Sequence, residues 1–418
     1  MLQILLNGLT IGDLDGTGHR LRLRYDPDAL ADPAFVPLST GLPASQLRWR
    51  DARIRNWIQG LLPEREGVAR RWRAEFGVSD TNPESLLAHI GEDVAGAAQF
   101  VRPDRMDIVL QGAASLTPLS EPDIRDLVLA ARRDMLPYDA DAGVGRFSLA
   151  GAQAKLALRR TEDGWALPAG AEPSTHIFKP AIPGLQGQEV SEVLSMRTAA
   201  RAGLPTAPAF VADFGGQRVL GIERYDRVVV EDRWCRVHQE NLCQAAGVYP
   251  LFKYESQSGP GAAACAALIR RTCGQGDVEA FARAMIFNYL VRGSDAHAQN
   301  YAILITPGNN RLAPLYDLNT TLTFGQSWAT TMAMRIGGAD RFDRVDRLAW
   351  DQFASDVGVP PEWVADELRR LSKRVPDALA DARAELGSEV AGGVGEVFQD
   401  RLREWLGHVN ATLDRSKR

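Results

Sequence analysis

Cysteine is scarce in this chain, and long apolar runs are missing. Only four of the 418 residues are cysteine, the first of them is Cys235, and none belongs to a Cys-x-x-Cys pair. Such sparse cysteines are typical of reduced thiols in the cytoplasm, not of a disulfide framework or a zinc site. No run approaches the roughly 18 apolar residues that span a bilayer. The opening residues, Met1 to Leu6, lack the basic start of a signal peptide and predict a strand. We therefore expect a cytoplasmic protein with no membrane partner.

An excess of basic charge is also missing. The chain has 48 Lys and Arg against 53 Asp and Glu, which gives a net charge of −5. Overall charge therefore does not recruit the chain to nucleic acid or to an anionic membrane. With 45% hydrophobic and 24% charged residues, the composition is that of a folded globular protein, and the length suggests two or three domains.

The pattern of apolar residues changes along the chain. Residues 1–102 mix a strand-like alternation with helical patches and predict a small α+β module. Residues 103–121 carry prolines and few periodic apolar residues, which predicts a linker. Residues 120–225 combine a loop containing several glycines with strands and a helix. Residues 226–418 are mostly helical, with a β-hairpin expected over 301–316.

The residues most typical of catalysis lie between the helix expected at 277–293 and this hairpin. Asp295 and Asn300 are close together in the stretch 293–300, and the antiparallel hairpin is expected to bring Asp317 back beside Asn300. Phosphoryl transfer from a magnesium nucleotide needs one carboxylate to orient the incoming hydroxyl, and an amide and a second carboxylate to hold the metal. Each residue alone is more often a helix cap or a hairpin end. Their convergence favours the catalytic interpretation.

Two further features are compatible with a bound nucleotide. Glycines in 143–155 let backbone N–H groups approach phosphates, although this loop lacks the Gly-Lys-Ser/Thr triplet of a P-loop and is weak evidence alone. Ser148 in this loop is a hydroxyl that could itself be phosphorylated. Lys179 ends a β-branched strand, where kinases place a phosphate-binding lysine that a helical carboxylate, here Glu189 or Glu192, orients. Without the catalytic trio, Lys179 would be interpreted as an exposed strand end.

The stretch 221–226 joins the strand-rich part of the chain to the helical part. A connector at this place exposes backbone groups that can bind the edge of an adenine. An ordinary connector between two lobes has the same pattern, and the residues leave both interpretations open.

Seven short runs, in family order, resemble the HipA family of serine/threonine protein kinases, which are toxins of bacterial toxin–antitoxin modules. The runs are Ser148–Lys155, Thr175–Pro180, Glu223–Arg227, Glu240–Gln244, Lys253–Glu255, Ser294–Asn300 and Leu315–Asp317. Asn56–Glu64 and Gly91–Gly96 resemble the family's N-terminal subdomain, so the resemblance is essentially full length. It implies an α+β, two-lobed protein-kinase-like fold. An extra N-terminal α+β subdomain (1–102) would precede an N-lobe with the Gly-rich loop (120–225) and an all-helical C-terminal lobe with the catalytic loop (226–418).

The resemblance also implies a role for each candidate residue. Asp295 would be the catalytic base, and Asn300 and Asp317 would be the ligands of Mg²⁺. The residues implied to contact ATP are Ala150, Gly151, Ala152, Gln153, Ala154, Lys155, Lys179, Glu223, Arg224, Tyr225, His297, Asn300, Tyr316 and Asp317. Ser148 matches the family's autophosphorylated serine, and about two negative charges added there would repel the nucleotide. His297 is expected to pack or hydrogen-bond the loop and not to act as a base.

The resemblance further implies partners. A HipB-like helix-turn-helix antitoxin would neutralise the chain, and contact with operator DNA would come through that antitoxin. The protein substrate would be a translation component, such as glutamyl-tRNA synthetase.

Two other functions stay open on the residues alone. The Asp-x-His-x-x-Asn spacing from Asp295 to Asn300 also resembles phosphoinositide kinases, so the acceptor could be a small molecule or a lipid. The other alternative is a catalytically silent corepressor of a helix-turn-helix partner. The intact set of Lys179, Asp295, Asn300 and Asp317 argues against the corepressor, because inactive kinases usually lose one of these residues.

Overall fold

The computed structural model describes residues 1–50, 52–64, 66–78, 82–111, 114–133, 151, 153–325 and 331–415. The chain divides into two compact units. Unit 1 comprises Met1–Ile182, Ala212–Leu251 and Ala302–Asn310, and unit 2 comprises Pro183–Val211, Phe252–Tyr301 and Arg311–Arg418.

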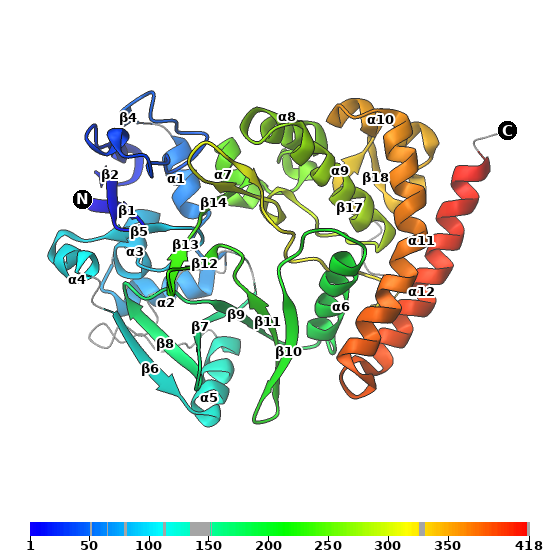
Figure 1. The fold of residues 1–418 in the computed structure, drawn as a ribbon, viewed down its shortest axis with the longest axis horizontal. Helices are drawn as coiled ribbons and strands as arrows, with labels where there is room; N and C mark the ends of the chain where they lie inside the picture. Colours follow the sequence, from blue (N-terminus) through cyan, green and yellow to red (C-terminus); the bar gives the residue numbers. More distant parts are fainter. Residues whose placement is uncertain are drawn as a thin grey trace. The chain divides into compact units, whose positions relative to one another are not determined.

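Unit 1 begins with a five-stranded antiparallel sheet in the order β4-β3-β2-β1-β5 (Figure 1). Its strands are β1 (Leu2–Leu6), β2 (Leu9–Asp15), β3 (Arg22–Tyr25), β4 (Arg48–Trp49) and β5 (Ala98–Val101). Asn7 and Gly8 join β1 to β2 with φ angles of 49° and 85°, the pair of left-handed residues that a type I′ hairpin turn needs. The accompanying helices are α1 (Ala52–Gln59), α2 (Glu66–Glu75), α3 (Pro83–Ile90) and α4 (Met106–Leu110). The buried rings of Trp57 and Phe100 lie 6.2 Å apart in the core of this module.

A second sheet has the strand order β10-β11-β9-β7-β8-β6. Its strands are β6 (Ala114–Leu119), β7 (Leu156–Thr161), β8 (Gly164–Gly170), β9 (His176–Pro180), β10 (Ala209–Phe214) and β11 (Gln217–Glu223). The prediction of a linker over 103–121 is wrong, because β6 pairs with β8 along its whole length. Pro118 cannot donate a ladder hydrogen bond, but β6 is an edge strand, where proline is tolerated. Ser120 then begins helix α5 (Glu121–Arg132) with a capping box to Asp123.

Two strand pairs complete unit 1. Strands β12 (Arg227–Val230) and β13 (Arg233–Arg236) form an antiparallel hairpin. Strand β14 (His238–Asn241) pairs antiparallel with β15 (Ala302–Ile305) and leads into helix α7 (Leu242–Ala246). The expected first strand of the 301–316 hairpin is therefore present. Its returning strand is only β16 (Arg311–Leu312), shorter than the sequence predicts.

Unit 2 is mainly helical. Its helices are α6 (Gln188–Arg201), α8 (Ala262–Thr272), α9 (Gln275–Leu290), α10 (Arg347–Val357), α11 (Pro361–Leu386) and α12 (Ser388–Arg415). Helix α11 packs against α6, α9, α10 and α12, and Figure 1 shows α11 and α12 side by side in orange and red. The C-terminal part is not all-helical as predicted, because β17 (Thr331–Ile336) and β18 (Ala339–Arg341) form a small antiparallel sheet.

Two further structural findings concern the cysteines and the length of the apolar helices. All four cysteines are free thiols. In the part of the chain that the structure describes, no helix combines the length and the apolar character needed to cross a lipid bilayer.

Candidate active site

The loop that carries Asp295 follows a helix whose residues are almost all buried near its C-terminal end. The residues from Ala284 to Leu290 in α9 are buried on every side, so the helix end is fixed by packing. The Gly293 N–H donates to the Asn288 carbonyl over 2.7 Å. A Cβ at Gly293 would lie 2.5 Å from Asn288 Oδ1, so any larger residue would force Asn288 or the loop to shift.

The Asp295 carboxylate lies at the surface and has one strong hydrogen-bond donor. Its side chain is 60% exposed, and the Tyr254 hydroxyl donates to Oδ1 over 2.6 Å. The buried His297 ring has Nε2 3.8 Å from the same oxygen and packs edge-on against Tyr254 with 5.0 Å between the ring centroids. The carboxylate is thus oriented from one side while it remains accessible to a hydroxyl group.

Asn300 closes the loop onto Asp295. Its Nδ2 donates to the Asp295 carbonyl over 2.7 Å, and its side chain is buried. The Tyr316 hydroxyl donates to the Gln299 carbonyl over 2.6 Å. Gln299 and Tyr316 immediately precede Asn300 and Asp317, so this bond links the two stretches through the Tyr316 side chain. The placement of Asp317 beside Asn300 stays a prediction.

The donor set at this place fits a magnesium ion. Because Asn300 uses Nδ2 to bind the Asp295 carbonyl, its Oδ1 is the atom that can accept or coordinate. Asp317 supplies a carboxylate from a residue with a left-handed φ of 58°. Magnesium prefers such oxygen ligands and completes its shell with water and phosphate oxygens. Among the described residues, no group of three or more His, Cys, Asp or Glu is placed to hold a metal ion by itself.

A cavity of about 320 Å³ lies beside Asp295 within unit 2. It is lined by Tyr254, Glu255, Ser256, Ser294, Asp295, Thr331, Met332, Ala333, Arg335 and Asp340. The Arg335 N–H donates to a Glu255 carboxylate oxygen over 2.6 Å, which ties β17 to the segment that carries Tyr254. The cavity gives an acceptor side chain room to reach the carboxylate.

Several residues predicted to contact phosphate lie together in unit 1. Lys179 is buried in β9, opposite Leu220 of β11. The Gln153 side-chain amide donates to the Pro180 carbonyl over 2.9 Å, and Lys155 Nζ donates to the Gln153 carbonyl over 3.2 Å. The predicted contact residues Ala150 and Ala152, and the candidate phosphorylation site Ser148, lie outside the described residues.

Gly151 is held against the N-terminal module. Its carbonyl accepts a hydrogen bond from the Glu64 N–H over 3.2 Å, and it forms an isolated bridge with Pro63. A Cβ at Gly151, whose φ is 107°, would lie 2.7 Å from Lys155 Nζ. Ala154 directly precedes Lys155 and is partly buried. The described end of the Gly-rich loop is therefore set by contacts with two lysine-bearing segments and with the module.

The connector after β11 carries three of the residues predicted to contact ATP, Glu223, Arg224 and Tyr225. Glu223 is exposed at the end of β11, and the Tyr225 hydroxyl donates to Gln239 Oε1. The ATP contact of Arg224 stays a prediction, and its side chain has partners within the protein. The guanidinium is buried and binds Asp226, the Ser174 hydroxyl and the Val94 carbonyl, all within unit 1.

The candidate carboxylates for orienting Lys179 lie on α6 in unit 2. Glu189 and Glu192 are both buried, and the Gln188 side-chain amide donates to Glu192 over 2.8 Å. Sequence reasoning missed the role of Tyr254, because a spacing rule does not detect a lone tyrosine that binds a carboxylate. It also missed the charges around Arg224, although oppositely charged residues next to a buried strand are a signal of ion pairing.

Comparisons with known proteins find two family models and several relatives that together match nearly the whole chain. A model of the HipA-like C-terminal domain matches residues 147–379, and a model of the HipA N-terminal domain matches residues 2–101. The putative kinase Y4mE of Sinorhizobium fredii is 34% identical over 410 residues, which are 96% of this chain and 94% of that protein. The serine/threonine-protein kinase toxin HipA of Shewanella oneidensis is 28% identical over 404 residues, which are 91% of this chain and 88% of that protein.

A solved structure has the same fold. In the Shewanella oneidensis complex of HipA, HipB and operator DNA, one chain matches with a TM-score of 0.81, at 24% identity and over 99% of both chains. At this identity the match shows the fold alone.

Proposed function

The chain belongs to the HipA family of kinases, and we propose from this premise that it transfers the γ-phosphoryl group of magnesium ATP to protein serine or threonine. One observation carries the proposal. The Asp295 carboxylate is exposed, while the Asn300 side chain is bonded to the carbonyl of the same residue. This fixes the loop and leaves the carboxylate available to an acceptor, as a kinase base requires.

The chemistry assigned to Asp295 is proton removal from the acceptor. As the acceptor oxygen forms a bond with the γ-phosphorus, the carboxylate takes the hydroxyl proton, and the bond between the γ-phosphorus and the bridging oxygen breaks to release ADP. Tyr254 keeps one carboxylate oxygen in place by its hydrogen bond, so the second oxygen can face the acceptor. Asn300 and Asp317 would hold Mg²⁺, which supplies positive charge at the phosphates.

The remaining candidates are assigned to the nucleotide. Gly151, Gln153, Lys155 and Lys179 would approach the phosphates together with Ala150, Ala152 and Ala154, and Glu223 and Tyr225 would approach the adenine. His297 and Tyr316 would act through the loop, because one is buried beneath Asp295 and the other binds the Gln299 carbonyl.

The names of the relatives support a proposal for the biological role. We propose that the chain is the toxin of a HipBA-like module and acts in the cytoplasm. A helix-turn-helix antitoxin would neutralise it, contact with operator DNA would come through that antitoxin, and its substrate would be a translation-related protein such as an aminoacyl-tRNA synthetase. A curated relative named as a kinase toxin and a HipA–HipB–operator DNA complex with the same fold support this role.

The proposed activity can be tested on the purified chain. Wild type, Asp295→Asn and the control Asp351→Asn, an exposed carboxylate on α10, are incubated with magnesium and ATP. Intact mass and phosphopeptide mapping are expected to find one phosphate on Ser148 in wild type and control, and none in Asp295→Asn or without magnesium. Nucleotide binding without any phosphate transfer would point to a small-molecule or lipid acceptor, and no nucleotide binding would support the corepressor.

A further inference from the structure

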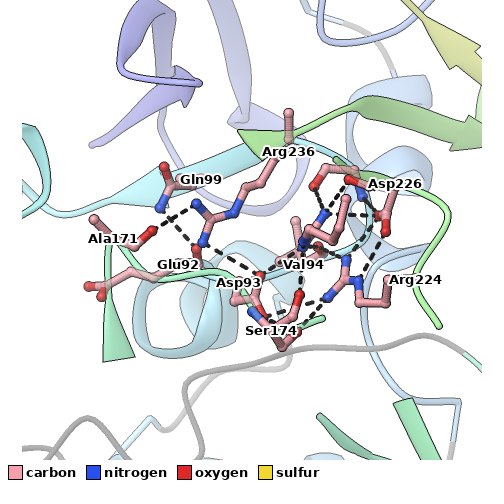
Figure 2. A network of polar contacts seen from close by, with 12 residues as sticks. Glu92, Asp93, Val94, Gln99, Ala171, Ser174, Arg224, Asp226 and Arg236 are labelled. Carbon is pink, nitrogen blue, oxygen red and sulfur yellow. Dashed lines mark hydrogen bonds and ion pairs between the residues drawn. The ribbon is translucent and has the colours of Figure 1, made fainter. Parts of the chain in front are cut away.

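A buried ion cluster joins three segments of unit 1 (Figure 2). It consists of Asp93, Ser174, Arg224, Asp226, Arg227 and Arg236. The side chains of all five charged members are less than a tenth exposed. Charges are this deeply buried only where ion pairs and hydrogen bonds compensate for lost water, so the positions of the three segments depend on one another.

The first segment is the turn of the N-terminal module that follows α3. Asp93 Oδ1 lies 2.8 Å from Arg227 Nη2, and Asp93 Oδ2 accepts a hydrogen bond from the Ser174 hydroxyl over 2.5 Å. The backbone of the same turn takes part as well. The Gly96 N–H donates to Asp226 Oδ2 over 2.7 Å, and the Val94 carbonyl accepts from Arg224 over 2.8 Å.

The other two segments carry residues that the proposed function assigns to the nucleotide. Ser174 lies just before β9, the strand of Lys179, and Arg224 lies between Glu223 and Tyr225. The Arg224 N–H donates to the Thr175 carbonyl over 2.9 Å, so the start of β9 and the end of β11 are joined at the cluster. Ser174 links this junction to the N-terminal module. Its hydroxyl donates to Asp93 Oδ2 and accepts from Arg224 Nη1 over 2.8 Å.

When Asp93 is ionised, two carboxylates, Asp93 and Asp226, face the three guanidinium groups of the cluster. Burial raises the pKa of Asp93, but Arg224, Arg227 and Arg236 outweigh burial and hold it below its ordinary value. Burial, opposed by the two aspartates, lowers the pKa of Arg227 to about 10, so this residue stays a cation at neutral pH. With Asp93 neutralised, three buried guanidinium groups would have Asp226 as the single carboxylate of the cluster, and the segments would shift to reduce the repulsion.

We propose that Asp93 is a positioning residue for nucleotide binding, which sets from within the N-terminal module the end of β11 that leads to Glu223 and Tyr225, together with the start of β9, the strand that carries Lys179 further along. The inference rests on the proposed function. It adds that the module is coupled to the nucleotide contacts through a single carboxylate. Any event that moves the 92–99 turn then changes nucleotide affinity, and by linkage nucleotide stabilises that turn.

The test compares neutral variants of two neighbouring buried carboxylates. Asp93→Asn removes one of the two negative charges of the cluster. Glu92→Gln is the matched control, because Glu92 forms its ion pair with Arg105 inside the N-terminal module. Ser174→Ala is a milder variant, for use if Asp93→Asn does not fold. Affinity for the non-hydrolysable analogue AMP-PNP with magnesium is measured by titration calorimetry, and folding by circular dichroism.

We expect Asp93→Asn to bind AMP-PNP about tenfold more weakly and Ser174→Ala about threefold more weakly, while Glu92→Gln stays within about twofold of wild type. A merely structural role would lower the melting temperatures of Asp93→Asn and Glu92→Gln and leave both affinities unchanged in the folded protein. That result, or an equal loss in both variants, would overturn the inference. Failure of wild type itself to bind AMP-PNP would contradict the proposed function instead.

Discussion

The phenol of Tyr254 holds one oxygen of the Asp295 carboxylate, and this contact gives a prediction at the scale of one residue. The 2.6 Å hydrogen bond and the buried ring of His297 restrict the rotation of an otherwise exposed side chain. Tyr254→Phe keeps the ring and removes the donor, so Asp295 would sample more orientations. We expect kcat for phosphate transfer to fall about tenfold, with little change in KM for ATP, because oriented groups lose rate when their geometry loosens.

Tyr289→Phe is the matched control for this prediction. Its hydroxyl binds the Phe342 carbonyl, and the ring is buried in the same unit. We expect it to change the melting temperature by a few degrees and kcat by less than about twofold. A rise in kcat for Tyr254→Phe would show that the Tyr254 hydroxyl instead occupies the place of the acceptor.

At the scale of elements, the turn from α9 into the catalytic loop depends on Gly293. An alanine Cβ there would lie 2.5 Å from Asn288 Oδ1 and 3.1 Å from the Asn319 carbonyl. Asn288 cannot move freely, because its Nδ2 binds the Ala284 carbonyl and the Tyr301 hydroxyl. Gly293→Ala should therefore displace the loop by a few tenths of an ångström or more and lower kcat by about 10- to 100-fold.

Gly276→Ala provides the comparison on the same helix. No atom lies within 4 Å of the added Cβ, and alanine favours the helix by up to about 1 kcal/mol. We expect a slightly higher melting temperature and an unchanged kcat, measured by autophosphorylation at saturating ATP. Equal rates for Gly293→Ala and wild type would mean that the loop does not depend on this turn.

At the scale of the whole molecule, the sequence predicts the features whose residues lie close together in the chain and match a known family. It does not predict the pairing of segments that lie far apart in the chain. The stretch from Asp295 to Asn300 was found because its polar residues lie within six positions of one another. Strand β6 was missed because an edge strand tolerates proline and lacks a strong apolar alternation. The role of Arg224 depends on Asp93 and Val94, which lie about 130 positions earlier. The spacing of residues near Arg224 in the sequence contains no information about partners that lie so far away in the chain.

His238 connects the N-terminal module to β14 in its neutral form, and this makes global stability depend on pH. Nε2 lies 2.9 Å from the Leu38 carbonyl and donates to it, while Nδ1 accepts from the Ala97 N–H over 3.4 Å. A second proton on Nδ1 would face that N–H group. Burial, opposed more weakly by Leu38 and Asp226, lowers the pKa of His238 to about 4 from 6.5.

The sign of the effect follows from linkage. Below pH 6.5, His238 binds a proton in the unfolded chain but stays neutral in the native protein. The free energy of unfolding therefore falls as the pH drops from 6.5 toward 4, by roughly 2 kcal/mol at pH 5. His238→Gln keeps a donor for Leu38 and has no proton to gain. Its free energy of unfolding, measured in urea, should fall less between pH 7 and pH 5 than that of wild type. Glu240, whose pKa is raised by burial, acts in the opposite direction, but it is present in both proteins. The difference between them therefore isolates His238, and equal changes would show that its neutral form does not hold the module.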